Sequence, residues 1–126
     1  MITTHTKDIE ILTDKGTITL TFSPSIPRGY GSLADAFYSY DRDCKIAIEV
    51  AAKDKKAGAL LKIETDYYSA LNFRNAIRTA LPDSEWEKIK DIIEEIDIKA
   101  VIEIASSIMT AYNEHYSEML TEGMEK

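Results

Sequence analysis

The feature that most constrains this chain is an alternating segment near its N-terminus, IEILTDKGTITLTF, which starts at Ile9. Apolar and polar residues alternate on both sides of Gly16, so each half has the period of a strand with one apolar face. A four-residue loop that ends at Gly16 predicts that Ile11 pairs with Ile18. The same register pairs Ile9 with Leu20 and places Gly16 at a positive φ. Because an isolated hairpin is only marginally stable, its apolar face must pack on other elements.

A loop is predicted directly after the hairpin. Residues 23–31 contain two prolines and two glycines, which favour turns over regular structure. Arg28 and Tyr30 lie beside these glycines, and loops often present the residues that bind a partner. Ser32 then has the chemistry of a helix N-cap, so the helical part of the chain is predicted to begin there.

Residues 45–50 fit two interpretations. Ile46, Ile48 and Val50 alternate as they would in a strand, and this strand would give the hairpin a third member. Alternatively, a helix that continues from Leu33 would place Cys44, Ala47, Ile48 and Ala51 on one face. The β-branched side chains of Ile46, Ile48 and Val50 favour the third strand.

A long helix is predicted to end at Leu81, because Pro82 cannot continue it. Its apolar residues recur about every 3.5 positions, which predicts a strongly amphipathic helix. The residues of its apolar face are Leu60, Ile63, Tyr67, Ala70, Leu71, Ile77 and Leu81. Arg74 and Arg78 are four residues apart and therefore share one side of the helix.

The C-terminal third starts with a predicted helix N-terminus, since Ser84 and Glu87 have the spacing of a capping box. Isoleucines follow at helical spacing. Asp97 either ends this helix and caps another, or lies within one bent helix that covers residues 84–120. The whole pattern predicts an α+β fold, in which an N-terminal antiparallel hairpin packs on three or four amphipathic helices.

Length and charge add to this prediction. The chain fits a single domain (1–126), with the hairpin over residues 7–22 and a mainly helical region over residues 32–126. Residues 1–82 hold 11 Lys/Arg and 10 Asp/Glu, whereas residues 83–126 hold 4 and 12. The net charge of −7 therefore comes from the C-terminal third. No basic stripe for phosphates is present there, so direct nucleic-acid binding is not expected.

The sequence contains no motif for catalysis or for metal binding. A di-iron bundle needs Glu-x-x-His, but Tyr112 stands three residues before His115. Cys44 has no second cysteine with which to bind zinc. The segment Arg28-Gly29-Tyr30-Gly31 lacks the Lys-Ser/Thr of a phosphate loop. We therefore expect neither an enzyme nor a cofactor.

The expected location is the cytoplasm. One cysteine fits a reducing compartment, because no internal disulfide can form. The first residues lack the basic start and apolar core of a signal peptide. No apolar run reaches the roughly 18 residues of a membrane span, so no membrane partner is expected.

The function that these patterns favour is binding to another protein. Carboxylates along a helix can occupy a basic channel that otherwise receives phosphates, as small acidic inhibitors from phages and mobile elements do. By this analogy of size and charge, the sequence predicts a small non-enzymatic regulator, such as an anti-defence inhibitor of a basic nucleic-acid-binding protein. Tyrosines would add contact area with a polar tip. The predicted contact residues are Glu87, Asp91, Glu94, Glu95, Glu103, Tyr112, Glu114, Tyr116, Glu118, Arg28 and Tyr30.

Two alternative functions stay open. The first is a structural subunit that forms a homo-oligomer through the apolar faces of its helices. The second is a module for a small molecule, in which Arg28, Arg74 or Arg78 binds an anion.

Overall fold

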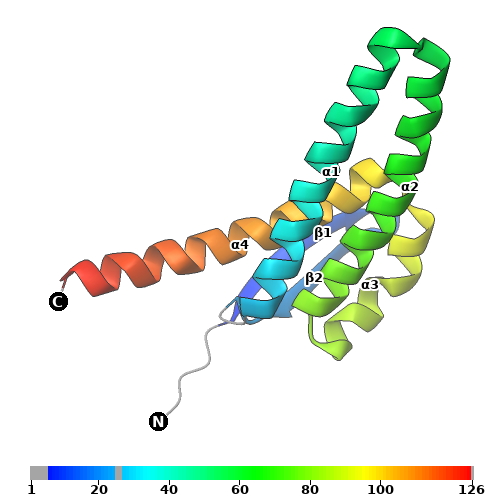
Figure 1. The fold of residues 1–126 in the computed structure, drawn as a ribbon. Helices are drawn as coiled ribbons and strands as arrows, with labels where there is room; N and C mark the ends of the chain where they lie inside the picture. The colour runs from blue at the N-terminus through cyan, green and yellow to red at the C-terminus, as the bar shows by residue number, and fades with distance from the viewer. Residues whose placement is uncertain (1–5, 25–26, 126) are drawn as a thin grey trace.

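The computed structural model describes residues 6–24 and 27–125. In this part of the chain, one hairpin is followed by four helices, so the predicted α+β fold class is confirmed (Figure 1). The elements in chain order are β1 (Lys7–Thr13), β2 (Gly16–Phe22), α1 (Pro27–Lys53), α2 (Lys55–Ala80), α3 (Asp83–Glu95) and α4 (Ile98–Glu125).

The hairpin has the predicted register. Ile11 lies opposite Ile18, and the apolar side chains of both strands share one face. Gly16 has a φ of +123°, a backbone conformation that residues with a Cβ rarely adopt. Pairing extends one step beyond the prediction, to Thr13 and Gly16, and leaves a two-residue turn. The Thr13 hydroxyl closes this turn by donating to the Gly16 carbonyl over 2.6 Å.

The third strand predicted over residues 45–50 is wrong, because this segment belongs to α1. Ala47 is buried, and it lies on the same side of the helix as Ala51, which contacts α2. Ile46 and Ile48 project to solvent on either side of that contact. Close packing on α2 therefore outweighs the strand propensity of the β-branched residues.

The loop predicted over residues 23–31 is shorter in the structure, since α1 begins at Pro27. Proline suits the first turn of a helix, where a backbone N–H would have no helical partner. Gly29 is buried, and a Cβ there would lie 3.0 Å from Ala80 Cα and would collide with the Tyr112 hydroxyl. This glycine lets α1 start close against α2 and α4. Residues 25 and 26 of the predicted loop lie outside the described residues.

Two separate helices, α3 and α4, occupy the region where one bent helix was the alternative. Asp97 separates them, and its carboxylate accepts a hydrogen bond from the Ala100 backbone N–H over 2.9 Å. The capping box predicted at Ser84 is wrong. Pro82 is the N-cap residue of α3, without a side-chain hydrogen bond, and Asp83 and Glu85 supply negative charge in the first turn.

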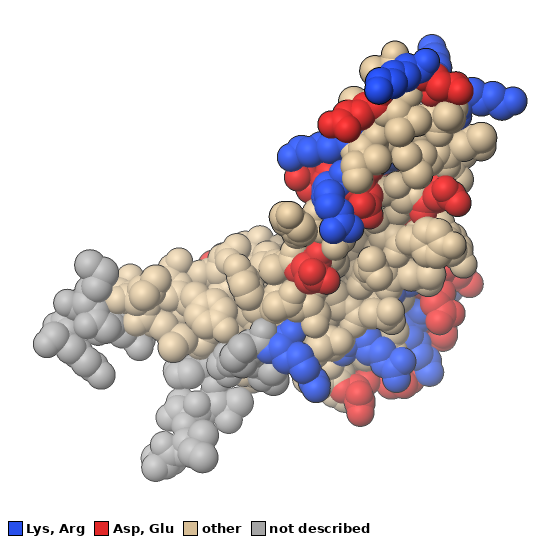
Figure 2. Space-filling view, in the orientation of Figure 1, with Lys and Arg blue, Asp and Glu red and all other residues tan. Residues whose placement is uncertain are grey.

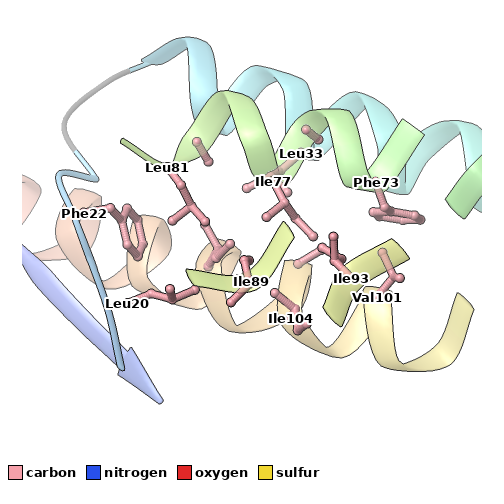
Figure 3. Close-up of a cluster of buried hydrophobic side chains, with 14 of the residues drawn as sticks. Leu20, Phe22, Leu33, Phe73, Ile77, Leu81, Ile89, Ile93, Val101 and Ile104 are labelled. Atoms are coloured by element: carbon pink, nitrogen blue, oxygen red, sulfur yellow. The ribbon is translucent and has the colours of Figure 1, made fainter. Parts of the chain in front are cut away.

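The core lies where the hairpin meets α3, α4 and the adjoining halves of α1 and α2. Figure 3 shows Leu20 and Phe22 of β2 at one end of the cluster, which extends to Phe73 of α2 and Val101 of α4 at the other end. Its largest fully buried members are Leu20, Phe22, Leu33, Phe73, Ile77, Ile89, Ile93, Val101, Ile108 and Tyr112. Burying each of these side chains contributes about 1.5–3 kcal/mol relative to exposure. The apolar face of the hairpin thus has the partner that it requires.

Helix α3 also covers the outer edge of β2. Glu85 accepts a hydrogen bond from the Thr21 backbone N–H over 3.1 Å, and Lys88 donates to the Thr19 carbonyl over 3.2 Å. Lys88 lies 2.8 Å from the Glu85 carboxylate and holds the pKa of Glu85 below its usual range. These two side chains satisfy strand groups that would otherwise remain unpaired at a sheet edge.

The contact between α1 and α2 leaves no room for a side chain at Gly58. A Cβ there would lie 2.6 Å from the Ala51 backbone nitrogen and closer still to Ala51 Cα and Cβ. Gly58→Ala is therefore expected to lower the free energy of unfolding by about 1–3 kcal/mol, because the two helix backbones must separate. Urea denaturation followed by circular dichroism measures this change.

Gly31→Ala is the matched control. It makes the same exchange inside a helix, but among the described residues no atom beyond the chain neighbours and the adjacent turns of its own helix lies within 4 Å of the new Cβ. Helix propensity alone then acts, and the free energy of unfolding is expected to rise by about 0.5–1 kcal/mol. A Gly58→Ala protein that is as stable as the Gly31→Ala protein would contradict the close contact of α1 and α2.

Candidate protein-interaction surface

Helices α1 and α2 form an antiparallel pair whose joined ends project beyond the rest of the molecule (Figure 1). We call residues 41–71 the arm. Asp54 lies at its tip between the two helices and caps α2 by accepting a hydrogen bond from the Ala57 N–H over 3.2 Å. No residue of the arm belongs to the core cluster. The two helices of the arm therefore pack chiefly on each other.

Small residues fill the contact between the two helices of the arm. The buried residues of the arm are Ala47, Gly58, Thr65, Ser69 and Ala70. Such residues let two helix backbones come close together. They also remove little apolar area from water, because their side chains are short.

Large apolar side chains of the arm face solvent instead. They are Ile46, Ile48, Leu60, Ile63, Tyr67, Tyr68 and Leu71. Ile48 is 69% exposed and Ile63 is 66% exposed. These seven are the majority of the twelve exposed large apolar residues in the described chain, although the arm is a quarter of its length. Such a concentration on one element is typical of an interaction site.

Four of these residues form a continuous strip on α2. We call Leu60, Ile63, Tyr67 and Leu71 the α2 stripe, because residues three or four apart share one helix face. All four are among the residues that define the predicted apolar face of this helix, and the structure leaves them exposed. Burial falls instead on the opposite side of α2, at residues such as Ser69, Phe73 and Ala76.

The face of α2 that carries the α2 stripe continues beyond the arm into the rest of the described chain, which we call the body. There, helix α3 covers this face. Arg74 and Arg78 follow at the same spacing. Arg74 Nε donates to the Ile93 carbonyl over 2.9 Å, and its Nη2 donates to the Ile96 carbonyl over 3.3 Å, which closes the end of α3. Arg78 lies over the Trp86 ring, with Cζ 5.9 Å from the ring centroid. One face of α2 is thus covered from Arg74 onward and uncovered along the arm.

A polar cluster ties α1 to α2 at the base of the arm. Lys62 Nζ lies 2.5 Å from an Asp66 carboxylate oxygen, and the Tyr40 hydroxyl donates to the same oxygen over 2.9 Å. Asp66 raises the pKa of Lys62, so the ammonium stays charged well above neutral pH. Partial burial raises the pKa of Tyr40. Since these groups satisfy one another, they position the helices and are not free to bind an ion.

The charges of the arm balance. Residues 41–71 contain six Lys/Arg and six Asp/Glu, so the net charge of −7 lies entirely outside the arm. On the face that Figure 2 shows, charged side chains of both signs gather at the tip and edges of the arm, with uncharged surface between them. The arm is therefore an apolar surface with a mixed-charge rim, the general anatomy of a protein interface.

The acidic residues predicted on α3 are all exposed. Glu87, Asp91, Glu94 and Glu95 face solvent, and Glu87 forms an ion pair with Lys90 at 2.8 Å. The other three form no ion pair with any described residue. Helix α3 thus presents three free carboxylates on its outer surface.

The acidic residues predicted on α4 lie in two other places. Glu103 lines a cleft of about 370 Å³ between β1, α3 and α4. Glu114 and Glu118 are exposed, and their carboxylates lie 4.0 and 3.1 Å from the Lys7 ammonium. The structure therefore distributes the predicted acidic surface over three sites rather than bringing it together.

The predicted tyrosine contacts separate into buried and exposed members. Tyr112 is 0% exposed and belongs to the core, so it cannot touch a partner in this conformation. Its ring contacts those of Phe22 and Tyr30, with centroids 5.8 and 6.0 Å apart. Tyr116 packs edge-to-face on Tyr30 at 5.8 Å, and both keep part of their surface in solvent.

The three arginines predicted as anion ligands do not all converge on one site. Arg28 and Arg78 line one shallow surface hollow, and the carboxylate of Asp83 lies in the same hollow. A carboxylate there opposes the binding of an anion. Arg74 is directed at the end of α3 and donates to backbone carbonyls.

Other kinds of site find no support in the described chain. No three His, Cys, Asp or Glu side chains within residues 6–24 and 27–125 are grouped to hold a metal ion. None of the described helices combines the length and the apolarity that crossing a membrane requires. No family model, curated protein or solved structure matches this chain. The functional proposal therefore rests on the surfaces themselves.

The sequence also contains a pattern that indicates close packing of α2, although the spacing of the large apolar residues is more conspicuous. Gly58, Thr65, Ser69, Ala76 and Ala80 also recur at helical spacing, on the side of α2 opposite to the α2 stripe. A second face made of small residues favours close helix packing on that side. Large apolar residues on the first face must then find another partner.

The buried Tyr112 hydroxyl provides a test of the core. It has no hydrogen-bond partner among the described residues, and burial raises the pKa of Tyr112 to about 12. Tyr112→Phe is expected to raise the free energy of unfolding by about 1 kcal/mol, because a polar group that loses its hydration without a new partner destabilises the folded state. Urea denaturation at neutral pH measures the change, with the exposed Tyr38→Phe as a control that leaves stability unaltered.

The same hydroxyl makes stability depend on pH. The pKa of Tyr112 is about 12 in the folded chain, above the value of about 10 expected after unfolding. The folded state therefore holds this proton more tightly than the unfolded state does. Titration of Tyr112 leaves the free energy of unfolding unchanged well below about pH 10 and lowers it as the pH rises from about 10 toward 12. Wild type should lose more stability between about pH 9 and pH 11 than Tyr112→Phe. Equal losses would contradict the burial of this hydroxyl.

Proposed function

We propose that this protein is a non-enzymatic protein-binding module that holds its partner with the arm. The observation that supports this proposal is the inverted arrangement of the arm, with small residues between the helices and large apolar residues outside. Each square ångström of apolar surface removed from water contributes about 25 cal/mol. A partner that covers the α2 stripe gains this free energy without any rearrangement of the core.

The shape of the arm favours a helical partner. The α2 stripe offers anchors at the spacing by which one helix recognises another. Beside it, Ile46, Leu61 and Tyr68 line a shallow groove of about 290 Å³ between α1 and α2. The Tyr67 and Tyr68 rings contact each other edge-to-face at 5.2 Å, and tyrosine combines apolar area with a hydroxyl that tolerates water at an interface rim. These features together suit a helix or a helical hairpin laid along the arm.

A second candidate contact is the outer surface of α3. The observation that favours it is the set of three free carboxylates, Asp91, Glu94 and Glu95. A basic surface, such as that of a nucleic-acid-binding protein, would pair with them. The carboxylates would then occupy the place of the nucleic-acid phosphates, and the protein would act as an inhibitor. Helix α3 lies away from the tip of the arm, so the two contacts can be tested separately (Figure 1).

Site-specific photo-crosslinking distinguishes the two contacts. A photoreactive amino acid replaces Tyr67 on the arm, Glu94 on α3 or Leu12 on the hairpin, and the protein is produced in its native host. Leu12 is the control because it is 85% exposed but belongs to neither surface. We expect position 67 to yield a discrete crosslinked protein, identified by mass spectrometry, and position 12 to yield none. Crosslinking from position 94 alone would overturn the arm as the binding surface.

Salt gives an independent readout on the captured complex. An apolar contact on a neutral arm is expected to keep its affinity when the salt concentration rises from about 0.05 to about 0.5 M. A contact made by the carboxylates of α3 would instead weaken steeply, because salt screens exposed charges. Titrations of the purified partner at both salt concentrations measure the difference.

A further inference from the structure

We infer that the partner on the arm is a second copy of this chain, with the two arms antiparallel across a two-fold axis near Ile63. This inference rests on the proposed function, because it names the occupant of the same surface. A two-fold contact uses one patch twice, and the patch must therefore complement itself. The charge and the spacing of the arm both meet this requirement.

Overall charge favours contact between two copies at the arm and nowhere else. The rest of the molecule carries the whole net charge of −7, so two copies repel each other when α3 or α4 approaches its counterpart. The arm has no net charge, and its tip lies away from α3 and α4 (Figure 1). It is thus the large apolar surface on which two copies meet with the least repulsion. A strongly basic or acidic partner would gain no electrostatic attraction from it.

The charge within the arm selects the antiparallel orientation. Its tip half, residues 49–60, holds three basic and two acidic residues. The base half, residues 41–48 and 61–71, holds three basic and four acidic residues. An antiparallel pair places the positive tip of one copy beside the negative base of the other. A parallel pair would place like charges together, which is unfavourable.

The spacing of the α2 stripe completes the geometry. With the axis near Ile63, this residue packs on its own counterpart, and Leu60 of one copy meets Tyr67 of the other. Two helical hairpins then form a four-helix arrangement, which supplies the second layer that a lone hairpin lacks. All members of the α2 stripe except Leu71 then have an apolar counterpart in the other copy, and Leu71 lies opposite the aliphatic stem of Lys56.

Oligomeric state tests the inference directly. Sedimentation equilibrium of the full chain from about 1 µM to about 1 mM is expected to show a monomer–dimer equilibrium. Ile63→Asp places two carboxylates at the axis and should raise the dissociation constant of the dimer at least about tenfold. Leu12→Asp makes the same change on an exposed residue of the hairpin and should leave the constant unaltered. Both side chains are exposed, and circular dichroism verifies that the variants fold.

Cysteine crosslinking tests the orientation. In a Cys44→Ser background, Ile63→Cys should form a disulfide-linked dimer on oxidation, because the two residues meet at the axis. Lys56→Cys should not, since an antiparallel pair separates the two copies of this residue by about 20 Å along the helix. A parallel pair would crosslink at both positions.

Three results would overturn the inference. They are a chain that is monomeric over the whole concentration range, a dimer that survives Ile63→Asp, and a Lys56→Cys protein that crosslinks as well as Ile63→Cys. The proposed function can still hold in these cases, because crosslinking of a different protein from position 67 would show that the arm binds a partner other than itself. If position 67 yields no crosslinked protein and the chain also stays monomeric, both the proposed function of the arm and the dimer are contradicted.

Discussion

The close contact between α1 and α2 is the constraint on which the rest of this structure depends. At Gly58 and Ala51 the two backbones leave no space for one additional methyl group. The other buried positions along the arm are also small. Helices that lie this close cannot hold isoleucine, leucine or tyrosine between them, so these residues must project outward. The apolar surface of the arm is thus a consequence of how its helices pack.

Helix α3 shows what completes such a surface. Along the body, Arg74 caps the end of α3 and Arg78 lies over Trp86, so the outward face of α2 is covered. Along the arm the same face continues with apolar residues in place of arginine and has no cover. The change from arginine to apolar side chains occurs between Leu71 and Arg74, where α3 ends. The body has its own hydrophobic core. The arm instead exposes large apolar side chains, as a helix does before it packs on another element.

Charge distinguishes the two candidate surfaces. The carboxylates of α3 and α4 are exposed in three places and define no common site. Exposed charges act over distance and are screened by salt, so they influence the rate and selectivity of association more than its strength. The arm concentrates large apolar side chains on a surface of zero net charge. Apolar area of this kind provides most of the free energy of association.

The sequence by itself determined the features that depend on neighbouring residues. The register of Ile11 on Ile18, the positive φ of Gly16 and the end of α2 before Pro82 each follow from local backbone chemistry. Only the tertiary structure decided that residues 45–50 are helical and that the α2 stripe is exposed while Tyr112 is buried. The physical reason is that a core face and an interface face are both made of large apolar side chains. Which of them is buried depends on where the neighbouring helices lie.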